Sequence, residues 1–299
     1  RYPCAFFPAT HSVDRSQESA VMELFSTHSL AWLSALAIAL FATGLIAGVM
    51  AGLLGVGGGI VIVPVLFHLF TLLDVDPSVR MHVAVATSLA SIIPTSLMSS
   101  RAHRRRGSLD ANLIRQLLPG VIVGVIVGAV LSSHLAGKTL SALFGLVALL
   151  VALQMAFKRE GSYWADGLPG RLGNAVLGSV IGCLSILMGI GGGTLGVPIL
   201  ANLRVPMHTA VGTGALLGTV ISIAGALAYL VTGLDMPARP PFSLGYVNLL
   251  GFALIVPATM LSTRWGAALA HSINAQRLRQ VFAAFLAITA LRMLSGLLN

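Results

Sequence analysis

The stretch GLLGVGGGIVIVP at residues 52–64 breaks a long apolar run with five glycines, three of them consecutive. A second stretch, ILMGIGGGTLGVP at residues 186–198, repeats four of these glycines and the closing Val-Pro pair at a constant offset of 134. Consecutive glycines inside a helix cost roughly 1 kcal/mol each against alanine, and they permit sharp, left-handed turns. Each stretch therefore predicts the end of one helix, a break and the start of another.

Apolar segments surround both breaks. The chain is 56% hydrophobic and only 9% charged, with a mean hydropathy of +0.92, whereas soluble domains carry charge on about a quarter of their residues. A bilayer core of about 30 Å requires roughly 20 apolar residues per helix. The composition thus predicts an all-α integral membrane protein with about eight to ten transmembrane segments. The apolar runs lie at about 31–54, 60–73, 80–100, 113–135, 139–157, 172–188, 194–203, 208–232, 245–269 and 278–298.

The chain divides into two homologous repeats. A second block, HVAVAT at residues 82–87, corresponds to HTAVGT at residues 208–213. We predict a polar tail at 1–29, a first repeat at 30–158, a cytoplasmic linker at 159–171 and a second repeat at 172–299. Five spans per half make the second repeat inverted, a common plan of secondary transporters. If the short second segment of each half is re-entrant, the count falls to eight and the symmetry changes.

Basic residues predict the orientation. Loops rich in Lys and Arg stay in the cytoplasm, so the Arg101–Arg106 loop is predicted to be cytoplasmic in a multi-pass protein of a bacterial inner membrane. This choice places twelve of the eighteen basic residues inside. The net charge of +9 does not indicate nucleic acid, because the basic residues lie in short loops without interleaved aromatics. The expected partners are the lipid bilayer and a small substrate, and the oligomeric state is left open.

The glycine breaks predict an anion site. A helix that begins at mid-depth directs unpaired amides and the positive end of its dipole into the protein. Pro64 and Pro198 are predicted to stand in the first turn of the new helices, where the missing amide costs little. The alternative is that the glycines only allow close packing, as predicted for Gly44, Gly48 and Gly52 and for Gly120, Gly124 and Gly128. The predicted substrate-binding residues are Gly55, Gly57, Gly58, Gly59, Pro64, Thr87, Gly189, Gly191, Gly192, Gly193, Pro198 and Thr213.

Titratable residues narrow the chemistry further. His82 and His208 are candidates for gating or protonation, or else interfacial anchors. All nine acidic residues fall in the tail, in loops or at segment ends, whereas cation pumps usually carry carboxylates inside the membrane. The sequence shows no CxxC, GxSxG or HExxH motif. We therefore expect no catalytic residue, no metal site, no cofactor and no enzymatic activity.

The two glycine blocks, with their Val-Pro pairs and the His-x-Ala-Val-x-Thr blocks, resemble the sulfite exporter TauE/SafE family from about residue 35 onward. The resemblance implies a secondary transporter for sulfite, an organosulfonate such as sulfoacetate, or a related small anion, with the glycine-proline blocks as the substrate path. The second copy departs from the first, because Ile186 occupies the position of Gly52. A non-transporting scaffold or biogenesis partner, and an anion channel, remain the alternatives.

Overall fold

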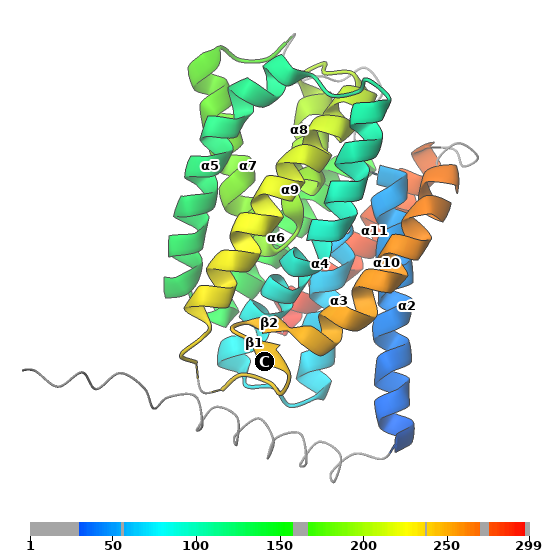
Figure 1. Cartoon of the computed structure of the whole chain (residues 1–299), viewed down its shortest axis with the longest axis vertical. Coiled ribbons are helices and arrows are strands. Elements are labelled where there is room, and N and C mark those ends of the chain that lie inside the picture. Colours follow the sequence, from blue (N-terminus) through cyan, green and yellow to red (C-terminus); the bar gives the residue numbers. More distant parts are fainter. Residues whose placement is uncertain (1–29, 55–56, 158–166, 237, 270–274, 297–299) are drawn as a thin grey trace, which may run out of the picture.

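A bundle of helices forms the molecule (Figure 1), and the computed structural model describes residues 30–54, 57–157, 167–236, 238–269 and 275–296. The predicted polar tail at 1–29 lies outside these residues, as does most of the predicted linker. The helices are α2 (Leu30–Leu54), α3 (Gly59–Leu72), α4 (Pro77–Arg105), α5 (Ala111–His134), α6 (Gly137–Phe157), α7 (Arg171–Met188), α8 (Gly191–Asn202), α9 (Met207–Thr232), α10 (Leu249–Leu269) and α11 (Ala275–Ser295).

Helix length separates the spanning helices from the short ones. Within the described residues, seven helices are long and apolar enough to cross a membrane, and α11 covers 21 residues. In contrast, α3 has 14 residues and α8 has 12, which at 1.5 Å per residue give about 21 and 18 Å, short of the bilayer core of about 30 Å. The chain is therefore an all-α integral membrane protein, and the predicted shortness of the second segment in each half is confirmed.

One predicted span begins too early. The sequence placed a helix at 245–269, but a two-residue hairpin of β1 (Ser243–Leu244) and β2 (Val247–Asn248) precedes α10. Gly245 turns the hairpin at a φ of +57° and lies against the backbone of Leu230. Since Leu244, Tyr246 and Val247 continue the apolar pattern, hydropathy alone did not reveal the turn.

Two helix pairs pack through glycine, α2 with α10 and α5 with α7. A Cβ at Gly44 of α2 would lie 2.7 Å from the carbonyl oxygen of Ile255 in α10, and one at Gly182 of α7 would lie 2.6 Å from that of Val121 in α5. Such distances require glycine, because the backbones meet directly. The packing role predicted for the glycines spaced by four is confirmed at Gly44, Gly48, Gly120, Gly124 and Gly128.

The predicted halves interleave in space. Each of the closest pairs, α2 with α10, α5 with α7, α6 with α11 and α4 with α9, joins a helix from 30–158 to one from 172–299. If each helix is matched to the helix five positions away in the other half, the pair α2–α10 becomes the pair α7–α5. The same matching leaves the pairs α6–α11 and α4–α9 unchanged. In Figure 1, α2 runs upward and its counterpart α7 runs downward. This is the pattern that an inverted twofold relation requires, and the duplication itself stays a prediction.

The helices α4 and α9 form the centre of the bundle. Within its most apolar window, α4 is 78% buried and α9 is 56% buried, against 33 to 44% for the other long spans. Their central position brings both helices alongside the two glycine breaks.

Candidate functional site

Both glycine stretches break the helical path, as predicted. In the first, Gly57 and Gly58 adopt φ values of +75° and +76° before α3 begins. In the second, Gly189 and Gly191 both adopt +67°, and α8 begins at Gly191. These left-handed conformations favour glycine over any residue with a Cβ. Gly55 lies outside the described residues.

The two breaks touch each other in the middle of the bundle. A Cβ at Gly59 would lie 2.6 Å from the carbonyl oxygen of Gly189 and 2.9 Å from the Cα of Ile190. The hydroxyl of Ser88 in α4 donates a 2.7 Å hydrogen bond to the same Gly189 carbonyl. Segments about 130 residues apart in the sequence therefore meet with almost no side chain between them.

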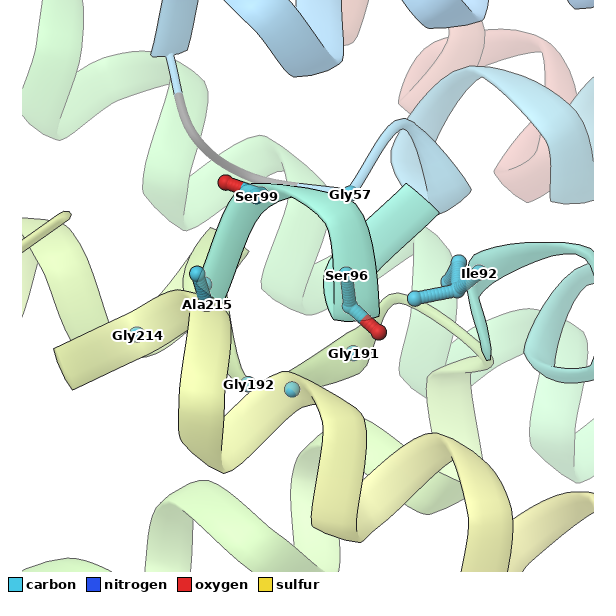
Figure 2. A pocket seen from close by; sticks show the side chains of 10 residues that line it. Gly57, Ile92, Ser96, Ser99, Gly191, Gly192, Gly214 and Ala215 are labelled. Carbon is cyan, nitrogen blue, oxygen red and sulfur yellow. The ribbon is translucent and has the colours of Figure 1, made fainter. Parts of the chain in front are cut away.

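A small cavity lies where the breaks meet, between α4 and α9 (Figure 2). Its space between the atoms is about 220 Å³, part of it open to solvent, and it is so narrow that it holds about one water-sized sphere. None of the described residues that line it is charged. Its lining residues are Gly57, Ile92, Ser96, Ser99, Gly191, Gly192, Gly193, Gly214, Ala215 and Gly218.

Backbone amides of α8 face this cavity. The first amides of a helix have no partner within it, and Ile190, the N-cap residue, offers no side-chain hydrogen bond. A Cβ at Gly218 would lie 3.3 Å from the Gly192 nitrogen and 3.7 Å from the Gly193 nitrogen. The backbone nitrogens of Gly192 and Gly193 thus lie directly beside Gly218 of α9, and all three glycines line the cavity.

Ile92 of α4 separates the two breaks. Its side chain would lie 3.1 Å from a Cβ at Gly57 and 3.3 Å from one at Gly191. Ser96 and Ser99 follow one and two turns later on the same face of α4, and Figure 2 shows the Ser96 side chain pointing toward Gly191. The Ser96 hydroxyl also bonds the Ile93 carbonyl of its own helix at 3.1 Å. The cavity thus combines glycine backbone and serine hydroxyl groups with the apolar side chains of Ile92 and Ala215.

The predicted glycines divide into two groups. Gly57 and the Gly191–Gly193 triplet line the cavity, whereas Gly58, Gly59 and Gly189 form the contacts that close the two breaks on their neighbours. A Cβ at Gly58, for example, would lie 2.7 Å from the Ala47 carbonyl oxygen.

The first-turn position predicted for the two prolines is wrong. Pro64 is the sixth residue of α3 and Pro198 the eighth of α8, because both helices begin within the glycine triplets and not after them. Each proline therefore lacks an amide that an unbroken helix would use, the one directed at the carbonyl four residues earlier. Neither proline lines the cavity.

Thr87 and Thr213 occupy matched positions but differ in their bonding. The Thr87 hydroxyl accepts a 2.9 Å hydrogen bond from the amide of Asn248, at the start of α10. The Thr213 hydroxyl is fully buried and has no hydrogen-bond partner. Neither side chain lines the cavity, although Gly214 and Ala215 beside Thr213 do.

The structure does not bring the two histidines together. His82 is buried near the start of α4, where its Nε2 lies 3.3 Å from the Ser132 carbonyl oxygen and 3.2 Å from that of Leu135. Its ring stacks on Tyr246 of the hairpin at a centroid distance of 5.2 Å, and burial raises the pKa of the Tyr246 phenol. His208 is exposed near the start of α9, at the opposite end of the bundle.

Six cavity residues were missed by the sequence reasoning. They share a helical spacing of three or four residues along α4 and α9, a signal that is visible in the sequence but common to every buried helix face. They are Ile92, Ser96, Ser99, Gly214, Ala215 and Gly218.

Comparison with known proteins identifies the family. The family model described as "Sulfite exporter TauE/SafE" matches residues 40–293. The chain belongs to the sulfite exporter TauE/SafE family. It is 30% identical over 250 residues to a "Probable membrane transporter protein" of Haemophilus influenzae, which covers 84% of this chain and 95% of that protein.

Two further relatives are also described as membrane transporters. The chain is 28% identical to the "Probable membrane transporter protein YunE" of Bacillus subtilis, over 78% of this chain and 88% of the relative. It is 26% identical to the "Probable membrane transporter protein MJ0441" of Methanocaldococcus jannaschii, over 85% and 94%. No solved structure matches the chain significantly. The chain is therefore a multi-pass membrane transporter.

Proposed function

We propose that this transporter is a secondary carrier of a small anion, namely sulfite, an organosulfonate such as sulfoacetate, or a related compound. The observation that carries the proposal is the N-terminus of α8 at Gly191–Gly193, which has no side-chain cap and lines the cavity where the two breaks meet. A helix N-terminus favours negative charge through its dipole and its free N–H groups. The Ser99 hydroxyl adds a further donor, and the Ser96 hydroxyl can donate to a ligand by exchanging its bond to the Ile93 carbonyl.

The cavity lining supports an anion over a cation. It contains no carboxylate, and across the described residues no group of three or more His, Cys, Asp or Glu side chains is placed to hold a metal ion. A bare cation would need several oxygen ligands, and the side chains that line the cavity offer only the neutral hydroxyls of Ser96 and Ser99. An oxyanion presents several acceptors, which match the donors of backbone amides and hydroxyls.

The packing favours gating by the short segments over rocking of one half against the other. Since α2 packs on α10 and α5 on α7 through glycine contacts, the halves are interlocked and have no free surface along which to slide. In contrast, the breaks before α3 and α8 end on flexible glycines. We therefore assign substrate passage to movement of α3, α8 and the Ile92 side chain. In the narrow state observed here, Ile92 lies between the two breaks.

Basic residues support an orientation in which the Arg101–Arg106 loop faces the cytoplasm of a bacterial cell, with the chain in the inner membrane. The helices α4, α8 and α10 end, and α5, α7 and α9 begin, at the same end of the bundle (Figure 1). Loops of this kind with many arginines are retained in the cytoplasm. That end carries Arg101, Arg104, Arg105, Arg106, Arg115, Arg171, Arg204 and Arg264.

A role in gating or protonation is proposed for His82 ahead of His208. His82 bonds the carbonyls of Ser132 and Leu135 at the end of α5, so a change in its protonation acts directly on the contact between α4 and α5. His208, in contrast, is exposed near the start of α9.

Flux measurements test the proposal. The purified chain in proteoliposomes is given labelled sulfite, sulfoacetate, sulfate, thiosulfate and acetate, with and without a pH gradient. We expect saturable flux of one sulfur anion. Gly218→Ala, which places a Cβ 3.3 Å from the Gly192 nitrogen, is expected to raise the half-saturating concentration, whereas Gly196→Ala, whose Cβ would meet nothing closer than 4.0 Å, is the matched control.

Three results would count against this function. If Gly218→Ala and Gly196→Ala changed the half-saturating concentration equally, the start of α8 would not be part of the binding site. Flux that rises linearly with concentration and ignores gradients would indicate an anion channel. An absence of flux for every anion, in protein that is correctly folded, would favour the scaffold or biogenesis partner.

A further inference from the structure

A second cavity lies far from the glycine breaks, at the arginine-rich end of the α5–α7 pair. It is an open pocket of about 890 Å³, including space open to solvent, and is lined by Asn112, Arg115, Gln116 and Pro119 of α5 and by Arg171 and Ala175 of α7. Two guanidinium groups and two carboxamides therefore line it, and none of the lining residues in the described part of the chain is a carboxylate. Asp110, the acidic residue nearest in sequence to this lining, accepts the amides of Asn112 and Leu113 as the N-cap of α5.

The floor of this basic pocket is fixed by contacts between the two helices. The buried Asn174 side chain of α7 donates a 2.6 Å hydrogen bond to the Gln116 side-chain oxygen of α5. One turn below, the Ser179 hydroxyl donates to the Gly120 carbonyl oxygen at 3.0 Å. Both arginines thus project from a rigid frame, since the backbones below them meet at glycine.

An apolar strip continues directly from the pocket along both helices. On α7, Leu172 and Val176 are 81% and 58% exposed, and on α5, Ile122, Val123 and Ile126 are 46 to 59% exposed. Side chains of this kind on a membrane helix face lipid tails. The pocket opens in the first turns of α5 and α7, so its arginines stand at the boundary between water and the hydrocarbon.

We propose that the basic pocket binds the phosphate headgroup of an anionic phospholipid whose acyl chains lie along the apolar strip of α5 and α7. Arginine binds phosphate oxygens through two parallel N–H groups, and basic pockets between membrane helices are suited to anionic headgroups. The strip identifies a lipid as the source of the phosphate, because a free anion makes no use of it. The proposal does not depend on the transported substrate.

Lipid titration of the full-length chain tests the site. The protein is stripped of lipid in mild detergent and titrated with phosphatidylglycerol, phosphatidylcholine or inorganic phosphate, with bound lipid counted by native mass spectrometry. Each arginine near a headgroup contributes about fivefold in affinity, so the double variant R115Q/R171Q is expected to weaken phosphatidylglycerol binding by about 25-fold. The control R101Q/R104Q removes the same charge from exposed arginines at the same end and is expected to change binding by less than about twofold.

Folding and competing occupants are separated by further readouts. The unfolding temperature without lipid should be equal for the native chain and both double variants, and R115K/R171K should retain most of the binding. Equal binding of phosphatidylglycerol and phosphatidylcholine overturns the proposal. Displacement of the lipid by millimolar phosphate would also overturn it, because that result indicates a site for a free anion. A dimer that dissociates only in R115Q/R171Q would overturn it as well, because that result indicates a protein interface.

Discussion

The two glycine breaks share a sequence pattern but face different side chains. Aligned on their His-x-Ala-Val-x-Thr blocks, α4 and α9 differ at three positions in the turns that follow these blocks. In α4 these positions hold Ser88, Leu89 and Ile92. In α9 they hold Gly214, Ala215 and Gly218, and all three line the cavity.

This difference shows how one duplicated pattern can build a one-sided site. Ile92 of α4 fills the space beside Gly57 of the first break, whereas Ser88 donates a hydrogen bond to the Gly189 carbonyl of the second break. Small residues of α9 leave space beside the second break. The glycines thus set the path of the backbone in both halves, while the facing helix decides which break a ligand can approach.

The largest expected effect comes from closing the second break. Gly192→Leu would place a Cβ 2.8 Å from the Gly218 nitrogen, so we expect transport to be abolished by a side chain that fills the cavity. Flux in proteoliposomes measures this, and membrane insertion is checked by the yield of monodisperse protein. Gly170→Leu enters open space and should transport normally. Normal flux in Gly192→Leu would remove the cavity from the substrate path.

A smaller effect should follow from opening the first break. Ile92→Ala removes the side chain between Gly57 and Gly191, and we expect flux of sulfoacetate relative to sulfite to rise by about tenfold, the effect of a few methylenes in a pocket. The space left by the deleted Ile92 side chain should also lower the free energy of unfolding by about 2–5 kcal/mol.

Leu89→Ala provides the control for this change. Leu89 is fully buried but does not line the cavity, so the variant should lose similar stability without a change in selectivity. If both variants shift selectivity equally, Ile92 does not separate the breaks in the way described.

The two histidines should contribute differently to the stability of the protein. His82→Ala removes the contacts to the Ser132 and Leu135 carbonyls and the stacking on Tyr246, and we expect a loss of about 2–3 kcal/mol. His208→Ala alters an exposed side chain and should change stability by less than about 0.5 kcal/mol. Thermal unfolding in detergent measures both, and pH-driven flux should respond only to the first. Equal pH responses would end the assignment of protonation to His82.

The smallest difference is expected between the matched threonines. Thr87→Val leaves the buried Asn248 amide without an acceptor and should cost about 1–2 kcal/mol. Thr213→Val removes a buried hydroxyl that has no partner, so it should be neutral or stabilising by up to about 1 kcal/mol. Chemical denaturation compares the two, and an equal loss would show that Thr213 has a partner in the membrane.

Much of the fold was predictable because its determinants are local. Helix α7 was placed at 172–188 and observed at Arg171–Met188, since hydropathy and helix length follow directly from the bilayer. The breaks were predictable because consecutive glycines reveal their conformational freedom in the sequence. The cavity lining was only partly predictable: Gly57 was identified, but Ile92 and Gly218 became visible only once α4 and α9 were packed against the breaks.

The hairpin before α10 and the position of the prolines show the same limit. Gly245 turns the chain because it lies against the backbone of Leu230, and that contact exists only in three dimensions. Pro64 was predicted to lie in the first turn of a helix, but the helix already begins at Gly59. In both cases tertiary contacts selected among conformations that the local sequence allowed.

The pairing of α2 with α10 has a consequence for biosynthesis. The first spanning helix of the described chain finds its closest partner only in the last fifth of the sequence. During synthesis the glycine face of α2 therefore stays in lipid until most of the protein has been inserted. The contact order of this pair is high, and contacts of this kind form late. The first five helices made alone are thus an incomplete product, whose exposed glycine face only the ninth helix of the described series can cover.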